Sequence, residues 1–362
     1  MLDNDKYWIA FSSVVQADSK FILSLYNHFG DIEKAWHSSD LSEINGLTIK
    51  QAETFFRLRD KTNVEEKVNM VLDRNLNYIT YEDKRYPYLL KQINNAPAMF
   101  YYRGDLEGCN LEKTVAVVGS RRATNAAKDI LAKIIAQLNQ TDICIVSGLA
   151  AGIDTVAHQS ALQNGLKTIG VIASGHDFIY PTNNRELYRK IASGNGVVLS
   201  EYFPTTEPLK FQFPQRNRIV TGLSYGTVVA EASLKSGALI SANLCLEQGR
   251  ELMCIPGLIS NPNTEGIYKL LKNGATLVTC AQDILEALGW EIKTGCEQMK
   301  LSLGDLPPEQ KKILKSIELE PKSFENILSE TKLDMENLLI SLTELEMMGI
   351  IKQIDGEKYT VV

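Results

Sequence analysis

The chain has 362 residues, with 38 Lys and Arg against 44 Asp and Glu, for a formal net charge of −6. At about 150 residues per domain, this length predicts two or three domains. The mildly acidic balance excludes a basic protein that coats nucleic acid by charge alone, and a hydrophobic content of 44% excludes a disordered chain.

The 6 cysteines and 4 histidines show neither a C-x-x-C pair nor the spacing of a zinc site. Cys144, Cys245 and Cys254 lie in apolar runs, as free thiols do in proteins of a reducing compartment. The N-terminus lacks the features of a signal peptide, and no apolar run reaches the ~18 residues of a membrane span. We therefore expect a cytoplasmic protein without a metal site or membrane span.

Apolar residues recur every three or four positions over residues 1–76, which predicts a small helical domain. Ile44, Gly46 and Leu47 resemble the turn of a helix-hairpin-helix, in which backbone N–H groups bind a phosphate. The same pattern also serves as a plain helix connector.

The segment 77–111 is aromatic and punctuated by proline, and we interpret it as a lead-in that packs beside the next domain. From 112 to 290, short apolar runs alternate with helical ones, which predicts βα units in a mostly parallel, doubly wound, Rossmann-like sheet. Together, residues 77–290 form the predicted main domain. Its seven expected strands lie in TVAVVG, DICIVSG, KTIGVIASG, GVVLSE, GTVVAEA, ELMCIPG and ATLV.

Residues 291–306 are polar and weakly patterned, as in a linker, and residues 307–362 have the order of a winged helix. In that order, Asp355 and Gly356 stand at the turn of the final hairpin. The helix expected to enter a DNA groove carries no Lys or Arg, which favours protein contact or packing over DNA reading. Its acidic residues are Asp334, Glu336, Glu344 and Glu346.

The first strand of the Rossmann-like domain is followed by Gly119, Ser120, Arg121 and Arg122. A dinucleotide enzyme would have a second glycine here, and two arginines occupy the space that its pyrophosphate needs. Arginine presents a planar set of donors to phosphodiesters, and the next helix adds N–H groups. The loop therefore predicts a phosphate-backbone clamp. The chain also has no P-loop motif for nucleotide hydrolysis.

The second loop contains Ser147, Gly148 and Gly152, which make another turn suited to an anion. Asp154 and His158 follow at a spacing of four and share one helix face, so they are within hydrogen-bonding reach. A Ser–His–Asp hydrolase would need a G-x-S-x-G elbow, which is absent. We therefore interpret the pair as shaping the loop.

Two further segments combine arginines, amides and aromatic rings, the composition of a surface that binds single strands, and in a third, Lys235 adds a point charge beside a Ser-Gly turn. Pro214 is expected in the first turn of a helix, and Ser236 and Gly237 in a donor-rich turn. The residues of interest in these segments are Tyr180, Arg185, Phe213, Arg216, Asn217, Arg218, Lys235, Ser236 and Gly237.

Five stretches in this order resemble the DNA-processing protein A (DprA, also called Smf) family: VAVVGSRRAT, SGLAAGIDTVAH, GHDFIYPTNN, EYFPTTEPLKFQFPQRNRIVTGLS and VVAEASLKSGALISANLCLEQGRELMCIPG. The resemblance covers nearly the whole Rossmann-like domain. The flanks also fit, because members of the family often carry an N-terminal sterile-alpha-motif-like or helix-hairpin-helix region and a small C-terminal winged helix. Many relatives have a lysine after the Tyr-Pro of the third stretch, where this chain has Thr182, and Arg185 is the expected substitute.

The resemblance implies a non-enzymatic, cofactor-free protein that binds single-stranded DNA without sequence preference. It also implies protection of incoming strands in natural transformation, loading of RecA recombinase and dimerisation through the Rossmann-like domain. From the loops and the resemblance together, the candidate nucleic-acid-binding residues are Gly119, Ser120, Arg121, Arg122, Ser147, Gly148, Gly152, Asp154, Tyr180, Arg185, Phe213, Arg216, Asn217, Arg218, Lys235, Ser236 and Gly237, with Arg121 and Arg216 central.

Two alternatives remain open. Gly226, Thr227 and Glu231 loosely resemble a turn of Rossmann-like nucleotide phosphoribohydrolases, although Leu223, Ser224 and Tyr225 stand where those enzymes have a doubled glycine. The winged helix is compatible with a transcription regulator. Charge favours a DNA groove in the main domain, because residues 112–290 carry 16 basic and 14 acidic residues while every flanking segment is net acidic.

Overall fold

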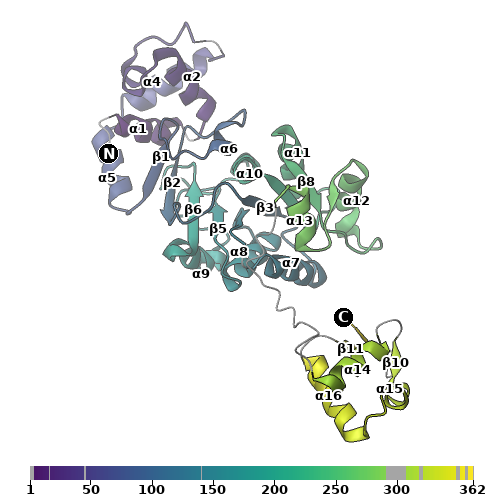
Figure 1. Ribbon diagram of the computed structural model, residues 1–362. Coiled ribbons are helices and arrows are strands. Elements are labelled where there is room, and N and C mark those ends of the chain that lie inside the picture. The colour runs from purple at the N-terminus through teal and green to yellow at the C-terminus, as the bar shows by residue number, and fades with distance from the viewer. Residues whose placement is uncertain are drawn as a thin grey trace. The chain divides into compact units, whose positions relative to one another are not determined.

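In the computed structural model, the described residues are 4–15, 17–44, 46–139, 141–290, 307–317, 321–347, 351–354 and 358–361. The chain divides into two units, residues 1–292 and 293–362 (Figure 1). The expected linker at 291–306 and the Asp355-Gly356 turn lie outside the described residues.

Five helices begin the first unit, as the apolar spacing predicts. Their starts carry local caps: the Asp18 side chain accepts from the Phe21 N–H, and Thr48 forms a capping box with Gln51. Ile44 and Leu47 pack into the core of these helices, so the turn acts as a helix connector here, and phosphate binding at it stays a prediction. The helices are α1 (Asp5–Val15), α2 (Ser19–Phe29), α3 (Ile32–His37), α4 (Ile49–Arg59) and α5 (Val64–Leu72).

The segment expected only to pack beside the main domain enters its sheet. β1 (Asn77–Thr80) pairs antiparallel with β2 (Met99–Gly104), and β2 pairs antiparallel with β6 (Gly196–Ser200). The short helix α6 (Tyr88–Lys91) lies between β1 and β2. Alternating burial explains the arrangement, because Met99 and Tyr101 face the N-terminal helices while Phe100 and Tyr102 face the core of the sheet.

The predicted mostly parallel sheet is confirmed, with nine strands in the order β1-β2-β6-β5-β4-β3-β7-β8-β9. All pairs from β6 to β9 in that order are parallel. The remaining strands are β3 (Thr114–Val118), β4 (Cys144–Ser147), β5 (Thr168–Val171), β7 (Gly226–Val229), β8 (Glu251–Cys254) and β9 (Thr276–Leu277).

Helices cover both faces of the sheet, which makes it doubly wound (Figure 1). On one face lie α10 (Gln212–Gly222), α11 (Ala238–Glu247) and α12 (Glu265–Lys272). On the other lie α7 (Asn125–Gln137), α8 (Ile153–Gln163) and α13 (Ala281–Ala287). Helix α9 (Arg185–Lys190) follows β5, and shorter helical turns span Thr182–Asn184, Ile191–Asn195 and Pro262–Thr264.

The second unit has the predicted winged-helix order. Its helices are α14 (Pro308–Ile317), α15 (Phe324–Thr331) and α16 (Met335–Met347). Its strands are β10 (Lys322–Ser323), β11 (Ile351–Ile354) and β12 (Lys358–Val361), which form a sheet in the order β10-β12-β11.

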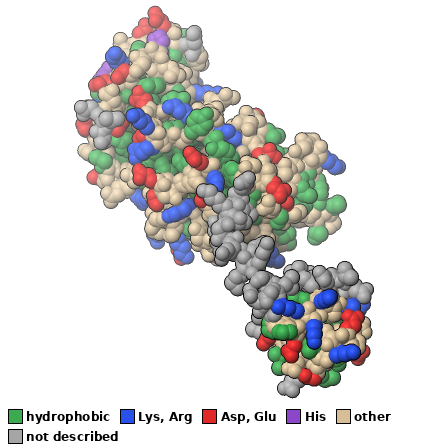
Figure 2. Space-filling model, in the orientation of Figure 1, with side chains coloured by type: hydrophobic (Ala, Val, Ile, Leu, Met, Phe, Trp, Pro, Cys, Tyr) green, Lys and Arg blue, Asp and Glu red, His purple; other side chains and the backbone are tan. Residues whose placement is uncertain are grey.

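Charged side chains of both signs are interspersed on the visible face of the first unit, which shows no uniformly basic surface there (Figure 2). This agrees with the net charge, so a nucleic-acid surface on this unit would be a local cluster of arginines. None of the described helices has the length and apolar composition needed to cross a bilayer.

Candidate nucleic-acid interface

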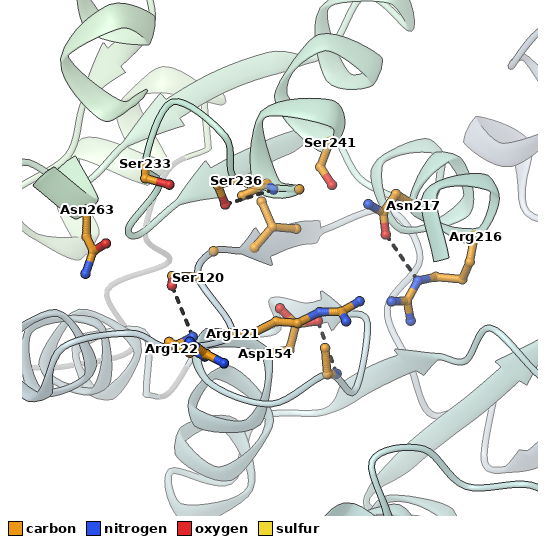
Figure 3. Close-up of a pocket in the computed structure, with 15 residues that line it drawn as sticks. Ser120, Arg121, Arg122, Asp154, Arg216, Asn217, Ser233, Ser236, Ser241 and Asn263 are labelled. Atoms are coloured by element: carbon orange, nitrogen blue, oxygen red, sulfur yellow. Dashed lines mark hydrogen bonds between the residues drawn. The ribbon is translucent and has the colours of Figure 1, made fainter. Parts of the chain in front are cut away.

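The candidate site lies at the topological switch point of the sheet, where the strand order runs to opposite sides of β3. β3 is bonded to β4 on one side and to β7 on the other, so the loops that follow β3 and β7 separate at the carboxyl edge of the sheet. A pocket of about 500 Å³ lies between them. The polar residues that line it are Ser120, Arg121, Arg122, Asp154, Arg216, Asn217, Ser233, Ser236, Ser241 and Asn263 (Figure 3).

Backbone hydrogen bonds to the neighbouring segments hold the loop after β3 in place. The Ser120 N–H donates to the carbonyl of Glu231 at 2.8 Å, and the Ser120 carbonyl accepts from the Ile153 N–H at 3.2 Å. The Ser120 hydroxyl accepts from the Arg122 N–H at 3.1 Å (Figure 3). Gly152 has a φ of +82°, and a Cβ there would collide with the Ser120 carbonyl, so this loop crossing requires glycine. The two arginines therefore project from a closely packed turn.

Glu231 anchors the far end of the same loop. Its buried carboxylate accepts from the Thr124 hydroxyl at 2.7 Å and from the Thr124 N–H at 3.3 Å. Thr124 in turn caps α7 by accepting from the Ala127 N–H at 3.2 Å. The carboxylate on which the phosphoribohydrolase alternative rests thus has a structural partner, and Glu231 is not among the residues that line the pocket.

Asp154 shapes the second loop, but it does not hydrogen-bond to His158, the partner that its spacing suggested. Its Oδ2 accepts from the N–H groups of Gly148 and Ala150 at 3.2 and 3.3 Å. Burial raises the pKa of this carboxyl, and the nearby Arg216 charge opposes the rise. His158 turns away toward the sheet, where its Nδ1 is 2.7 Å from the Thr168 hydroxyl, and burial lowers its pKa to about 3.

Arg216 lies in the floor of the pocket rather than on its rim. Its side chain is buried, and its Nη1 donates to the carbonyl oxygens of Gly148 and Val171. Its Nε donates to Asn217 Oδ1 at 3.3 Å. Burial lowers the pKa of Arg216 to about 10, a value at which it still carries its charge at neutral pH. Arg216 therefore joins α10 to the ends of β4 and β5 and places a positive charge beneath the pocket.

Aromatic rings continue the site from Arg121. The Arg121 guanidinium carbon lies 4.9 Å from the centroid of the Phe213 ring. The Phe213 ring meets Tyr180 edge to face, with centroids 5.6 Å apart and planes inclined by 66°. Tyr180 is 51% exposed although it is a large aromatic residue. The fold thus places a cation, a ring and a second, solvent-exposed ring in one row beside the pocket.

Two predicted contact residues are placed elsewhere, and we correct them here. Arg218 is 7% exposed, and its Nη2 lies 2.5 Å from Oε1 of the buried Glu201. The Ser147 side chain is fully buried and donates to the Val117 carbonyl at 2.6 Å. Both side chains are occupied within the protein, because β4 is a central strand buried along its whole length and Arg218 pairs with the buried Glu201.

Arg185 and Lys235 are exposed but do not line the pocket. Lys235 lies between two lining residues, Ser233 and Ser236, and Arg185 starts α9 next to the segment that carries Tyr180. Their roles in binding stay predictions.

The sequence interpretation missed Ser233, Ser241 and Asn263, which line the pocket. Ser241 was recognisable, because it follows Gly237 by four residues and so falls on the same face of α11. Asn263 belongs to a turn after β8, and no motif marks it.

Comparison with known families identifies this arrangement. Residues 77–289, the whole sheet with its pocket, match the family model described as DNA recombination-mediator protein A. The chain belongs to the DNA recombination-mediator protein A family. Residues 297–357 match a second model, the DprA winged helix domain. The resemblance to the DprA/Smf family is thereby confirmed.

Relatives in this family match over different extents. The chain is 32% identical to Protein Smf of Synechocystis over an alignment 389 positions long, which covers 98% of each chain. It is 46% identical to the DNA processing protein DprA of Streptococcus pneumoniae over 203 residues, or 56% of this chain and 71% of that protein. Membership of this family gives the chain a DNA-processing role in recombination.

Two solved DprA structures share the fold. The X-ray structure of DprA from Streptococcus pneumoniae superposes with a TM-score of 0.68 at 35% identity, covering 78% of this chain and 97% of that one. DNA processing protein A from Helicobacter pylori superposes with a TM-score of 0.53 at 32% identity, covering 58% and 95%. The second structure was described for its single-stranded DNA binding mode.

Proposed function

We propose that this protein binds single-stranded DNA without sequence preference through the pocket and the row formed by Arg121, Phe213 and Tyr180. The observation that carries the proposal is this row, because it combines a phosphate-binding cation with exposed aromatic surface. Nonspecific single-strand binding requires both: cations follow the backbone, and rings stack on bases of any sequence.

The pocket supplies the phosphate part of this surface. Arg121 and Arg122 project from the turn after β3, and Arg216 adds its charge from below. Ser236 and Gly237 stand at the start of α11, where backbone N–H groups and the helix dipole favour an anion. Asp154 is the acidic residue in the lining, and its carboxylate is turned to the Gly148 and Ala150 N–H groups.

Unpaired bases suit this site better than a duplex. In a duplex the bases stack on one another, and their faces do not reach protein rings. The main domain has only a small positive charge, so strong duplex coating by charge is not expected. The relation to the Helicobacter pylori protein, whose structure concerns single-stranded DNA binding, supports the same choice.

We further propose that the protein acts without catalysis, as a homodimer that protects single strands and helps load RecA, in natural transformation or recombination in the cytoplasm. Membership of a family of recombination mediators supports this role. Exposed apolar side chains at Leu258 and Ile259, in the loop after β8, and at Leu277, in the edge strand β9, support an interface on the Rossmann-like domain. Sedimentation of the protein tests the dimer.

The test of DNA binding is a titration of labelled single- and double-stranded oligonucleotides over a range of salt. We expect tighter binding to the single strand, weakened by Arg121→Ala together with Arg122→Ala. Arg57→Ala, which removes an exposed arginine of α4, is the matched control and leaves binding unchanged. Equal affinity for both DNA forms, or an unaffected double variant, would overturn the proposal.

A further inference from the structure

Helix α16 of the winged-helix unit has two apolar faces. Leu338, Leu342 and Leu345 are buried in the core of the unit. Met335, Leu339 and Ile340 of the same helix are exposed to 65%, 55% and 49%. A helix that only covers a core needs one apolar face, so three exposed large apolar side chains on the outer side require another explanation.

Acidic residues surround this exposed face. Glu346 is exposed, Glu344 accepts from Gln310 Nε2 at 2.7 Å, and Asp334 accepts from the Asn337 N–H at 2.8 Å at the start of the helix. Residues 333–347 contain no Lys or Arg, and Lys332 is the cation that immediately precedes them. The side chain of Glu336 lies outside the described part of the chain.

The position of α16 makes this charge informative. It is the third helix of the unit (Figure 1). In winged-helix proteins that read DNA, the helix at this position enters the groove. Acidic side chains there repel phosphates and gain nothing from counterion release. Exposed Met and Leu side chains instead gain free energy when they are covered by another apolar surface.

We propose that the outer face of α16 is a docking surface for a basic amphipathic segment of a partner protein. The apolar side of such a segment covers Met335, Leu339 and Ile340, and its Lys or Arg side chains meet Glu344 and Glu346. Charge complementarity selects this partner over a second copy of the unit. A two-fold contact through α16 would bring the acidic residues of both copies together.

The experiment uses the full chain and a synthetic amphipathic peptide with leucines on one helix face and lysines on the other, monitored by fluorescence anisotropy. We expect binding that weakens with salt, and a loss of about tenfold or more in affinity in Leu339→Gln with Ile340→Gln. Leu72→Gln, at an exposed leucine at the end of α5 in the first unit, is the matched control and preserves binding.

A second variant keeps the test independent of folding in the first. Glu346→Lys changes one exposed charge, so it weakens binding of the lysine peptide and improves binding of a peptide with glutamate in place of lysine. Equal peptide binding by the wild type and the Leu339/Ile340 variant overturns the proposal, as does no binding at all. So does a change in oligomeric state in that variant, which would assign the face to a second copy. Binding of single-stranded oligonucleotide is measured in the same samples and stays unchanged, so failure here is separate from failure of the DNA-binding proposal.

Discussion

The Arg121 guanidinium stands 4.9 Å from the centroid of the Phe213 ring, although 92 positions separate the two residues in the chain. The contact holds a flexible cation against a ring whose other neighbour is the exposed Tyr180. A guanidinium over a ring gains cation–π attraction, while its N–H donors point outward in the guanidinium plane and stay available to a ligand. Arg121 is thereby oriented before any phosphate arrives.

Replacement of the ring is expected to weaken DNA binding more than it weakens the fold. Phe213→Leu keeps apolar bulk but removes the stacking surface. We expect the binding free energy for single strands to weaken by about 1–3 kcal/mol. Phe213→Tyr retains the ring and is the matched control. The measurement is an oligonucleotide titration at fixed salt, and unchanged affinity in Phe213→Leu would remove the aromatic row from the binding site.

Removal of the rim arginines is expected to change the salt dependence of binding. Each lost phosphate contact lowers the slope of log K against log salt by about 0.7 for a single strand. We therefore expect a smaller slope for Arg121→Ala, and a still smaller one when Arg122→Ala is added. If the slopes match that of the wild type while affinity falls, the two arginines act on something other than phosphates.

Arg216 is expected to behave differently from Arg121. Arg216→Ala leaves the Gly148 and Val171 carbonyls without their donor and Asp154 without a neighbouring positive charge, at a cost of roughly 2–5 kcal/mol in the free energy of unfolding. Arg121→Ala, at an exposed position, changes the free energy of unfolding by less than about 0.5 kcal/mol. Denaturant unfolding of both variants decides the matter, and similar stabilities would contradict the buried role of Arg216.

Glu231 is expected to act on the loop and not on a bond of a substrate. Glu231→Ala removes the acceptor of the Thr124 hydroxyl and N–H, which we expect to cost about 1–3 kcal/mol of stability and to weaken DNA binding. Glu231→Gln keeps one acceptor oxygen and retains more of both properties. Release of free base from a nucleoside monophosphate by the wild type, lost in Glu231→Gln, would support the phosphoribohydrolase alternative instead.

His158 makes stability depend on pH. Its pKa is about 3 in the folded protein, whereas a histidine in the unfolded chain has a pKa near 6.5. Below pH 6.5 the unfolded state takes up a proton that the folded state refuses, so the stabilisation is complete above pH 6.5 and decreases as the pH falls toward about 3. Between pH 6.5 and about pH 5, we expect the free energy of unfolding of His158→Gln to fall by about 1.5 kcal/mol less than that of the wild type. Parallel stability profiles of the two proteins would show that His158 is not the group responsible.

Much of the fold was predictable because its signals are local. The seven parallel strands follow from short apolar runs separated by helical ones, and the loop glycines and arginines stand directly after those strands. The entry of β1 and β2 into the sheet was not predictable from their aromatic, proline-rich segment. β1 pairs with β2, and β2 pairs with β6, which lies about a hundred residues later in the chain. Pairing of this kind depends on residues far away in the sequence, so a local pattern does not reveal it.

From the net charge of −6 and its distribution, the sequence by itself determined that a nucleic-acid surface would be local, and it favoured residues 112–290, the one segment with a net positive charge. It also determined the residue types available to that site. Only the tertiary structure decided which arginines face the pocket, because burial depends on partners far along the chain. Arg216 meets the carbonyls of Gly148 and Val171, and Arg218, two positions later, meets Glu201 in the core. An offset of two positions places side chains on nearly opposite sides of a helix, so the two arginines have different surroundings. Side-chain donors already bonded within the protein are not available to a phosphate.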